Sequence, residues 1–102
     1  MGKFVRVAGV GDLRPGDAKQ VQAAGQEVAL FNVDGEYHAV AATCTHRGGP
    51  LAEGTLEREQ VTCPWHGAVF NVTSGAVVAG PAGEAIGQYP VRVVGDDVEI
   101  EV

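Results

Sequence analysis

Cys44-Thr45-His46-Arg47-Gly48 and Cys63-Pro64-Trp65-His66-Gly67 are the two stretches that decide how this chain is interpreted. Each stretch places one cysteine shortly before one histidine, and the chain contains 2 cysteines in all. Thiolates and imidazoles are ligands that proteins use for zinc and for iron. We therefore expect a single metal or cluster site, whose candidate ligands are Cys44, His46, Cys63 and His66.

The spacing of the two cysteines favours iron over zinc. Structural zinc usually takes two cysteines from one short knuckle, two to four residues apart, whereas Cys44 and Cys63 lie in separate stretches. In a Rieske centre, two cysteines hold one iron of a [2Fe–2S] cluster and two histidines hold the other iron. Two mixed loops, each giving one ligand to each iron, meet that demand symmetrically. A zinc-stabilised interaction module remains the alternative.

The paired motif resembles that of the Rieske [2Fe–2S] proteins, and most closely that of the small bacterial Rieske ferredoxins. The resemblance covers nearly the whole chain, because Gly80-Pro81-Ala82 is similar to the proline loop that covers the cluster in that family. It implies one [2Fe–2S] cluster per chain, with Cys44 and Cys63 on one iron and His46 and His66 on the outer iron.

Dense turn signals predict an all-β fold. The 15 glycines and 5 prolines leave no long window with helical periodicity. Asp34-Gly35 and Gly95-Asp96 each separate two β-rich runs, and such two-residue connections are typical of hairpins. The four runs are Gln26–Val33, Glu36–Ala42, Tyr89–Val94 and Asp97–Val102.

The middle of the chain carries both motifs and three further short strand predictions. These are Gln60–Thr62, Ala68–Val72 and Ala76–Val78, with a turn at Thr73-Ser74-Gly75 and an ordinary surface loop predicted over Gly11–Lys19. We expect one Rieske domain over residues 1–102: an antiparallel β-sandwich or barrel base with a cluster-binding subdomain inserted at about residues 43–81.

Charge and hydropathy exclude several classes of partner. The net charge is −6 and the sequence pI is about 4.8, which argues against binding to nucleic acid or to an anionic membrane surface. No apolar run approaches the length of a membrane span. Both cysteines are committed as ligands, which fits a reducing compartment. We expect a cytoplasmic protein.

Residues beside the motifs carry further expectations. Where high-potential relatives have a serine and a tyrosine that donate hydrogen bonds to the sulfurs, this chain has Ala68 and Phe70. The resemblance therefore implies a reduction potential near the bottom of the Rieske range, about −150 mV. We favour packing over docking for Trp65. For Gly48, Gly49 and Gly67, the expected role is a close approach of loop backbone to the cluster.

The function that the resemblance implies is electron transport rather than catalysis. Once two histidines are used as ligands only His38 remains, so the two-histidine, one-carboxylate iron site of an oxygenase cannot be assembled. We expect a carrier between an NAD(P)H-dependent flavoprotein or ferredoxin reductase and a terminal oxygenase, such as an aromatic-ring-hydroxylating dioxygenase. The alternative is a small Rieske subunit of a reductase complex, such as an assimilatory nitrite reductase.

Overall fold

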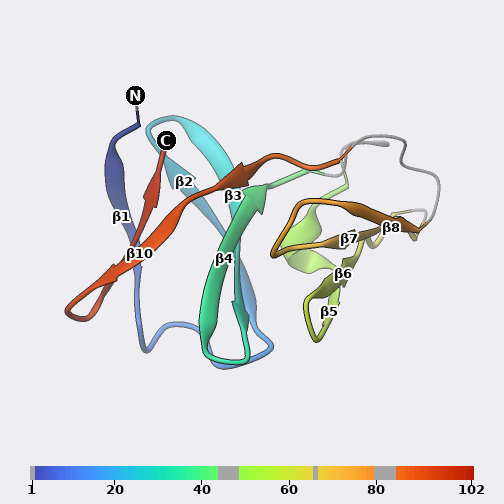
Figure 1. Cartoon of the computed structure of the whole chain (residues 1–102), viewed down its shortest axis with the longest axis horizontal. Helices are drawn as coiled ribbons and strands as arrows, with labels where there is room; N and C mark the ends of the chain where they lie inside the picture. Colours follow the sequence, from blue (N-terminus) through green and yellow to red (C-terminus); the bar gives the residue numbers. More distant parts are fainter. Residues whose placement is uncertain (1, 44–48, 66, 80–84) are drawn as a thin grey trace.

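The computed structural model describes residues 2–43, 49–65, 67–79 and 85–102, and nearly all of its regular structure is β (Figure 1). The strands are β1 (Phe4–Gly9), β2 (Ala18–Ala23), β3 (Gln26–Val33), β4 (Glu36–Ala41), β5 (Thr55–Glu57), β6 (Gln60–Thr62), β7 (Val69–Asn71), β8 (Val77–Ala79), β9 (Gln88–Tyr89), β10 (Val91–Val94) and β11 (Asp97–Glu101), with a 3₁₀ turn η1 at Leu51–Glu53. All strand pairs are antiparallel. The all-β prediction is confirmed.

Two of the three sheets form the base of the domain. One has the order β1-β11-β10 and the other the order β2-β3-β4-β9. Figure 1 shows both on the same side of the molecule, with the third sheet beside them. Among the described residues, no helix combines the length and the apolar character that crossing a membrane would require.

The hairpin of β3 and β4 agrees with its prediction. Val33 pairs with Glu36, so Asp34 and Gly35 form the two-residue connection. Both have positive φ, 56° for Asp34 and 96° for Gly35, as a type I′ turn requires. The second strand ends at Ala41, one residue earlier than predicted.

The predicted strand over Tyr89–Val94 is wrong in one respect, because it is two strands in different sheets. Tyr89 pairs with Ala39 of β4, whereas Val91 pairs with Ile100 of β11. Pro90 lies between them and has no N–H to donate to a ladder. The chain therefore changes sheets at the proline and closes the base.

The third sheet, β5-β6-β7-β8, occupies the sequence between β4 and β9. Its strand β6 has the predicted bounds, β7 is shorter than predicted, and β8 begins one residue later. The turn predicted at residues 73–75 connects β7 and β8. Strands β1, β2 and β5 were not predicted from the sequence, and the surface loop predicted over Gly11–Lys19 runs too far because β2 begins at Ala18.

Two apolar clusters pack on opposite faces of the second sheet. The base core fills the space between the two base sheets and contains Ala8, Leu13, Val21, Ala23, Val28, Leu30, Ala39, Val98 and Ile100. The shared core joins the second sheet to the inserted sheet and contains Ala29, Phe31, Val40, Leu51, Val61, Cys63, Ala68, Phe70, Val72 and Ile86. Strand β3 alternates between the two cores, so its central residues are buried on both faces.

Candidate metal centre

Of the four predicted ligands, the structure describes the surroundings of Cys63. Cys44, His46 and His66 lie outside the described residues, as do Arg47, Gly48 and the predicted proline loop at 80–82. The site is therefore built here from Cys63 and from the described residues that flank both motifs.

Cys63 is held in the wall of the shared core. It follows β6 directly, and only 3% of its surface is exposed. Its backbone N–H donates to the carbonyl oxygen of Ala68 at 2.7 Å. Gly67 has φ 74°, a conformation that disfavours residues with a Cβ. The second motif is thus a tight loop, closed at its base by a hydrogen bond, with a buried cysteine at its start.

The residues that flank the first motif contact each other through their backbones. Thr43 and Pro50 form an antiparallel bridge, and the N–H of Leu51 donates to the carbonyl oxygen of Ala42 at 2.9 Å. The residues on either side of the segment 44–48 are therefore paired with each other. Leu51 is fully buried in the shared core, which anchors the start of η1 close to where the motif ends.

Gly49 brings the two motifs together. A Cβ placed on Gly49 would lie 2.5 Å from Sγ of Cys63 and 3.1 Å from Cγ of Trp65. No other residue could take this position without displacing the sulfur or the indole. The expectation that Gly49 permits a close backbone approach agrees with this contact. A thiolate flanked by the backbone of the partner motif fits a centre that draws ligands from both stretches.

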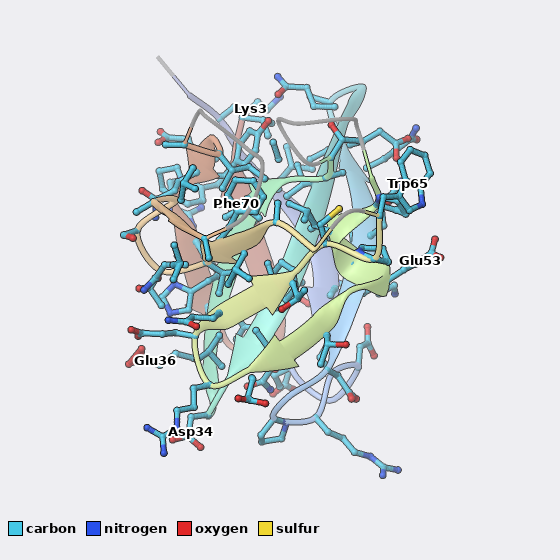
Figure 2. All side chains as sticks on the ribbon, turned by 90° about the vertical axis from the view of Figure 1, so that its right-hand side faces the viewer. Lys3, Asp34, Glu36, Glu53, Trp65 and Phe70 are labelled. Carbon is cyan, nitrogen blue, oxygen red and sulfur yellow. The ribbon has the colours of Figure 1, made fainter. Side chains whose placement is uncertain are left out.

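Trp65 is half exposed, with 50% of its surface accessible. The Cβ and Cγ atoms of Trp65 lie against Gly49, while the rest of the indole faces solvent. Figure 2 shows it at the margin of the molecule. The side chain therefore both packs and offers an aromatic surface next to the motif, whereas the sequence analysis favoured packing.

Ala68 and Phe70, the two positions relevant to the reduction potential, are fully buried in the shared core with Cys63. Neither side chain carries a hydrogen-bond donor. Ala68 also accepts the Cys63 backbone hydrogen bond. The environment of this sulfur on the β7 side is thus apolar.

The remaining histidine, His38, lies away from this centre. It belongs to β4, where its Nε2 is 3.6 Å from Oε1 of Glu36. Within the described ranges, no three His, Cys, Asp or Glu side chains converge as a metal site would require. Among the described residues, one side chain has a clearly shifted pKa, and it also lies away from this centre. The hydrogen bond to Asp97 raises the pKa of Arg6.

Comparison with known sequences identifies the chain with one domain family over most of its length. The Rieske [2Fe–2S] domain matches residues 3–90. The biphenyl dioxygenase ferredoxin subunit of Pseudomonas sp. (strain KKS102) is 39% identical over 96% of this chain and 91% of the relative. Apoptosis-inducing factor 3 of Mus musculus is 36% identical over 92% of this chain, but the chain spans only 16% of that relative's length.

Solved structures agree in fold. The ferredoxin of Sphingomonas yanoikuyae B1 has a TM-score of 0.92 at 30% identity and covers 98% of this chain and 99% of its own. A chain from the complex of reduced oxygenase and oxidized ferredoxin in carbazole 1,9a-dioxygenase has a TM-score of 0.90 at 32% identity, covering 95% and 91%. With the domain match over residues 3–90, these similarities show that the chain belongs to the Rieske [2Fe–2S] domain family.

Proposed function

We propose that this protein is a one-electron carrier that accepts an electron from a reductase and donates it to a terminal oxygenase. The observation that carries the proposal is that the similarity to the biphenyl dioxygenase ferredoxin subunit extends over nearly all of both proteins, 96% of this chain and 91% of the relative. The similarity to a chain from a complex of oxygenase and ferredoxin supports an oxygenase as the acceptor.

The cofactor is the one that defines the family, a single [2Fe–2S] cluster per chain. Cys44 and Cys63 would hold one iron, and His46 and His66 the other. Support for this ligand set comes from the burial of Cys63 and from the contact of Gly49 with its sulfur. When bound, the cluster supplies reversible one-electron chemistry.

The protein's own part is to hold and shield the thiolate end of the site. The shared core surrounds Cys63 with apolar side chains and keeps water from that sulfur. The Thr43–Pro50 bridge and the Cys63–Ala68 hydrogen bond fix the bases of the two loops. No bond-making step is assigned to any residue, so the protein acts as a carrier and not as an enzyme.

We infer a single domain over residues 1–102 with a cluster-binding subdomain at about residues 43–81. The inserted sheet, from Thr55 to Ala79, falls inside that range. We also infer a cytoplasmic location, because the proposed ligand set uses both cysteines as reduced thiolates. The reductase would be an NAD(P)H-dependent flavoprotein or ferredoxin reductase, and the oxygenase an aromatic-ring-hydroxylating dioxygenase.

Electron paramagnetic resonance tests the cofactor and the function together. Purified protein should give no signal when oxidised and a rhombic signal after dithionite reduction, with a lower average g than clusters held by four cysteines. Iron and acid-labile sulfide should be present in equal amounts on the same sample. A colourless protein containing stoichiometric zinc would contradict the proposal and favour a structural binding module.

Single substitutions test the ligand set. Replacing Cys44, His46, Cys63 or His66 by alanine should abolish the Rieske spectrum in each case, because each would remove one of the proposed iron ligands. His38→Ala is the matched control, since His38 lies in β4 with Glu36 as its nearest charged neighbour. Retention of iron and sulfide in the His66→Ala protein, or their loss in His38→Ala, would contradict the assignment.

A further inference from the structure

The base of the domain is open along one line, between strands β4 and β10. The chain connects the two strands through β9, where Tyr89 pairs with Ala39. Figure 1 shows β4 and β10 separating from there toward their hairpin turns, and no hydrogen bond joins these two described strands. A cavity of about 680 Å³ lies between them. We call this cavity the seam.

Both walls of the seam are strand edges. Residues 36–38 of β4 line one wall and residues 91–93 of β10 line the other. Consecutive side chains of a strand point to opposite faces of its sheet, so a cavity lined by three consecutive residues runs along the backbone edge. Strand β10 is the last strand of the first sheet, and β9 covers β4 only at Ala39 and Val40.

The backbone of Tyr37 faces the seam. Its neighbour in β3 is Asn32, which uses its own backbone groups on the opposite side. The N–H of Asn32 donates to the carbonyl oxygen of Asp17 at 3.0 Å, and its carbonyl oxygen accepts from the N–H of Gly16 at 2.8 Å. In an antiparallel pair that is not hydrogen-bonded, both residues direct these groups outward. The N–H and C=O of Tyr37 therefore point toward β10.

The backbone of β10 faces the seam at alternate residues. The carbonyl oxygen of Pro90 accepts from the N–H of Glu101 in β11 at 2.9 Å. Hydrogen-bonded pairs alternate along an antiparallel ladder, so Val91 and Val93 direct their N–H and C=O groups away from β11. The seam thus has unpaired backbone donors and acceptors on both walls.

The base core reaches the seam through apolar side chains. Val93 pairs with Val98 of β11, so their side chains share one face of the sheet, and Val98 is fully buried in the base core. Val93 is nevertheless 50% exposed, because β10 has no strand on its other side. Leu13 of the base core also lines the seam. An occupant that covered Val93 would remove apolar surface from water.

The charges of the seam are balanced. Its lining carries one carboxylate, Glu36, and one guanidinium, Arg92. Nε of Arg92 is 2.7 Å from Oε1 of Glu99, and Oε1 of Glu36 is 3.6 Å from Nε2 of His38. The seam therefore selects neither a cationic nor an anionic occupant, although the whole protein has a net charge of −6.

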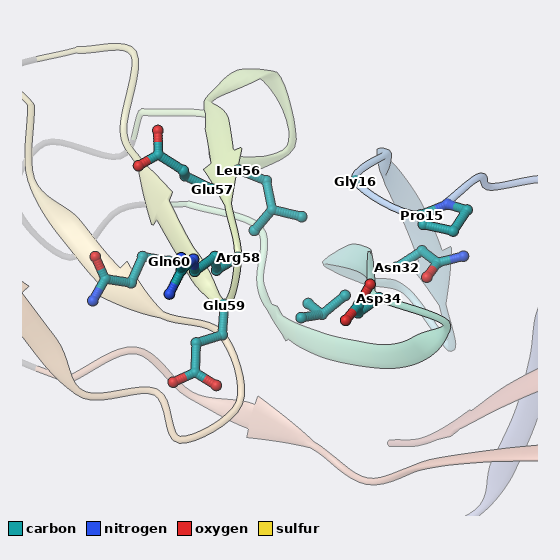
Figure 3. A pocket seen from close by; sticks show the side chains of 10 residues that line it. Pro15, Gly16, Asn32, Asp34, Leu56, Glu57, Arg58, Glu59 and Gln60 are labelled. Carbon is teal, nitrogen blue, oxygen red and sulfur yellow. The ribbon is translucent and has the colours of Figure 1, made fainter.

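Another hollow, of about 1120 Å³, lies between the tips of the β3–β4 and β5–β6 hairpins (Figure 3). Figure 3 shows the side chain of Leu56 directed across it toward the hairpin of Asp34. One of its walls is the end of β3, which is paired on both sides, with β2 and with β4. That hollow therefore lacks the two facing free edges that distinguish the seam.

We propose that the seam binds an extended, uncharged segment of a partner protein in which apolar residues alternate with polar residues. The backbone of the segment pairs with Tyr37 on one side and with Val91 and Val93 on the other, as in strand addition to a sheet edge. Its apolar side chains cover Val93 and extend the base core. A second copy of the whole domain fits less well, because it brings a like net charge of −6.

The test uses the cluster-loaded protein, labelled with ¹⁵N, and a capped heptapeptide of alternating valine and serine. Amide shifts should saturate on residues 36–38 and 91–93 as the peptide is added. Two analogues carry N-methyl groups, one on every valine and the other on every serine. Each analogue lacks the donors that face one wall, so each should bind at least about tenfold more weakly.

Val93→Ser and Val94→Ser are matched variants, because both valines are 50% exposed and only Val93 lines the seam. Val93→Ser should weaken peptide binding about fivefold, since an apolar contact is lost. Val94→Ser should stay within about twofold of the natural chain. An unchanged absorption spectrum and melting temperature would show that both variants keep the fold and the cluster site.

The proposal is overturned if the peptide causes no saturable shift, if the N-methylated analogues bind as tightly as the parent peptide, or if the two serine variants weaken binding equally. Shifts of the same amides with protein concentration, in the absence of peptide, would also overturn it and would assign the seam to a second copy of the chain.

Discussion

At the scale of single residues, Ala68 and Phe70 matter because their side chains have no hydrogen bond to donate to a sulfur. Both are fully buried beside Cys63 in the shared core, and neither has a polar hydrogen. Hydrogen bonds to the sulfurs of a cluster stabilise its reduced, more negative state and raise the potential. The natural protein should therefore have a midpoint near −150 mV, at the low end of the Rieske range.

Replacing Ala68 with serine should raise that midpoint. One added hydrogen bond is worth about 1 kcal/mol, which corresponds to about 40 mV for a one-electron couple. The measurement is a redox titration followed by circular dichroism. Ala39→Ser is the control, because Ala39 is equally buried but belongs to the base core. An equal shift in the control, or a natural midpoint well above zero, would refute this account.

At the scale of elements, the turn between β3 and β4 depends on glycine at position 35. Its φ of 96° is costly for any residue with a Cβ. Gly35→Ala should destabilise the hairpin by about 1 kcal/mol. Gly11→Ala is the matched control, because Gly11 has no neighbour within 4 Å of a built Cβ and no positive φ. Native-state hydrogen exchange of β3 amides measures both, and equal effects would contradict the turn argument.

The turn between β7 and β8 is hydrogen-bonded to the segment of the chain that returns from the inserted sheet to the base. Oδ1 of Asn71 accepts from the N–H and the hydroxyl of Thr73, at 2.8 and 2.6 Å. The turn also accepts two hydrogen bonds from the segment that returns to the base. Nε2 of Gln88 donates to the carbonyl oxygen of Thr73 at 2.6 Å, and the N–H of Ile86 donates to the carbonyl oxygen of Gly75 at 2.8 Å.

Asn71→Ala should therefore loosen residues far beyond position 71. Leaving the two Thr73 donors without their acceptor costs about 2 kcal/mol, so exchange of the Ile86 amide should become at least about tenfold faster. The double variant Asn71→Asp, Glu59→Gln keeps the acceptor oxygens at position 71 and avoids placing two carboxylates against each other, so it should stay within about threefold of the natural chain. Unchanged protection of Ile86 in the alanine variant would show that the turn does not anchor this segment.

Local signals predicted some elements and missed others for identifiable reasons. The dipeptides Asp34-Gly35 and Gly95-Asp96 predict their hairpins because they contain residues that tolerate positive φ. By contrast, the β5–β6 turn contains Arg58 at φ 57°, a conformation that its local sequence does not signal. Strand β1 pairs with β11, at the other end of the chain, and such long-range pairing leaves no local mark.

The metal centre divides in the same way. Residue type and spacing were enough to propose the four ligands, and all four stay predictions: three lie outside the described residues, and for Cys63 the structure shows its burial but not its ligation. The contact between Gly49 and Cys63 was expected only as a general backbone approach. The Thr43–Pro50 bridge and the placement of Cys63 in a core shared with the base depend on tertiary packing. No pattern within either motif encodes them.

At the scale of the whole molecule, the net charge of −6 should govern how fast partners meet. Attraction to a basic docking face raises the association rate, and salt screens it. The second-order rate of reduction by the reductase should fall by about tenfold between 0.05 and 0.5 M ionic strength. Stopped-flow kinetics measures this, with an uncharged chemical reductant as the control. A rate that does not change with salt would exclude electrostatic steering.

The inserted segment leaves and rejoins the base at one place. Ala41 of β4 donates its N–H to the carbonyl oxygen of Gly87 at 2.9 Å, and Ala39 pairs with Tyr89. A protein engineer could in principle excise residues 42–86 and join the ends with a short turn. That excision would expose Phe31 and Val40 to solvent, because both are buried in the shared core. The redox segment is thus a transplantable cassette in its connectivity, but a recipient scaffold would have to supply a matching apolar face.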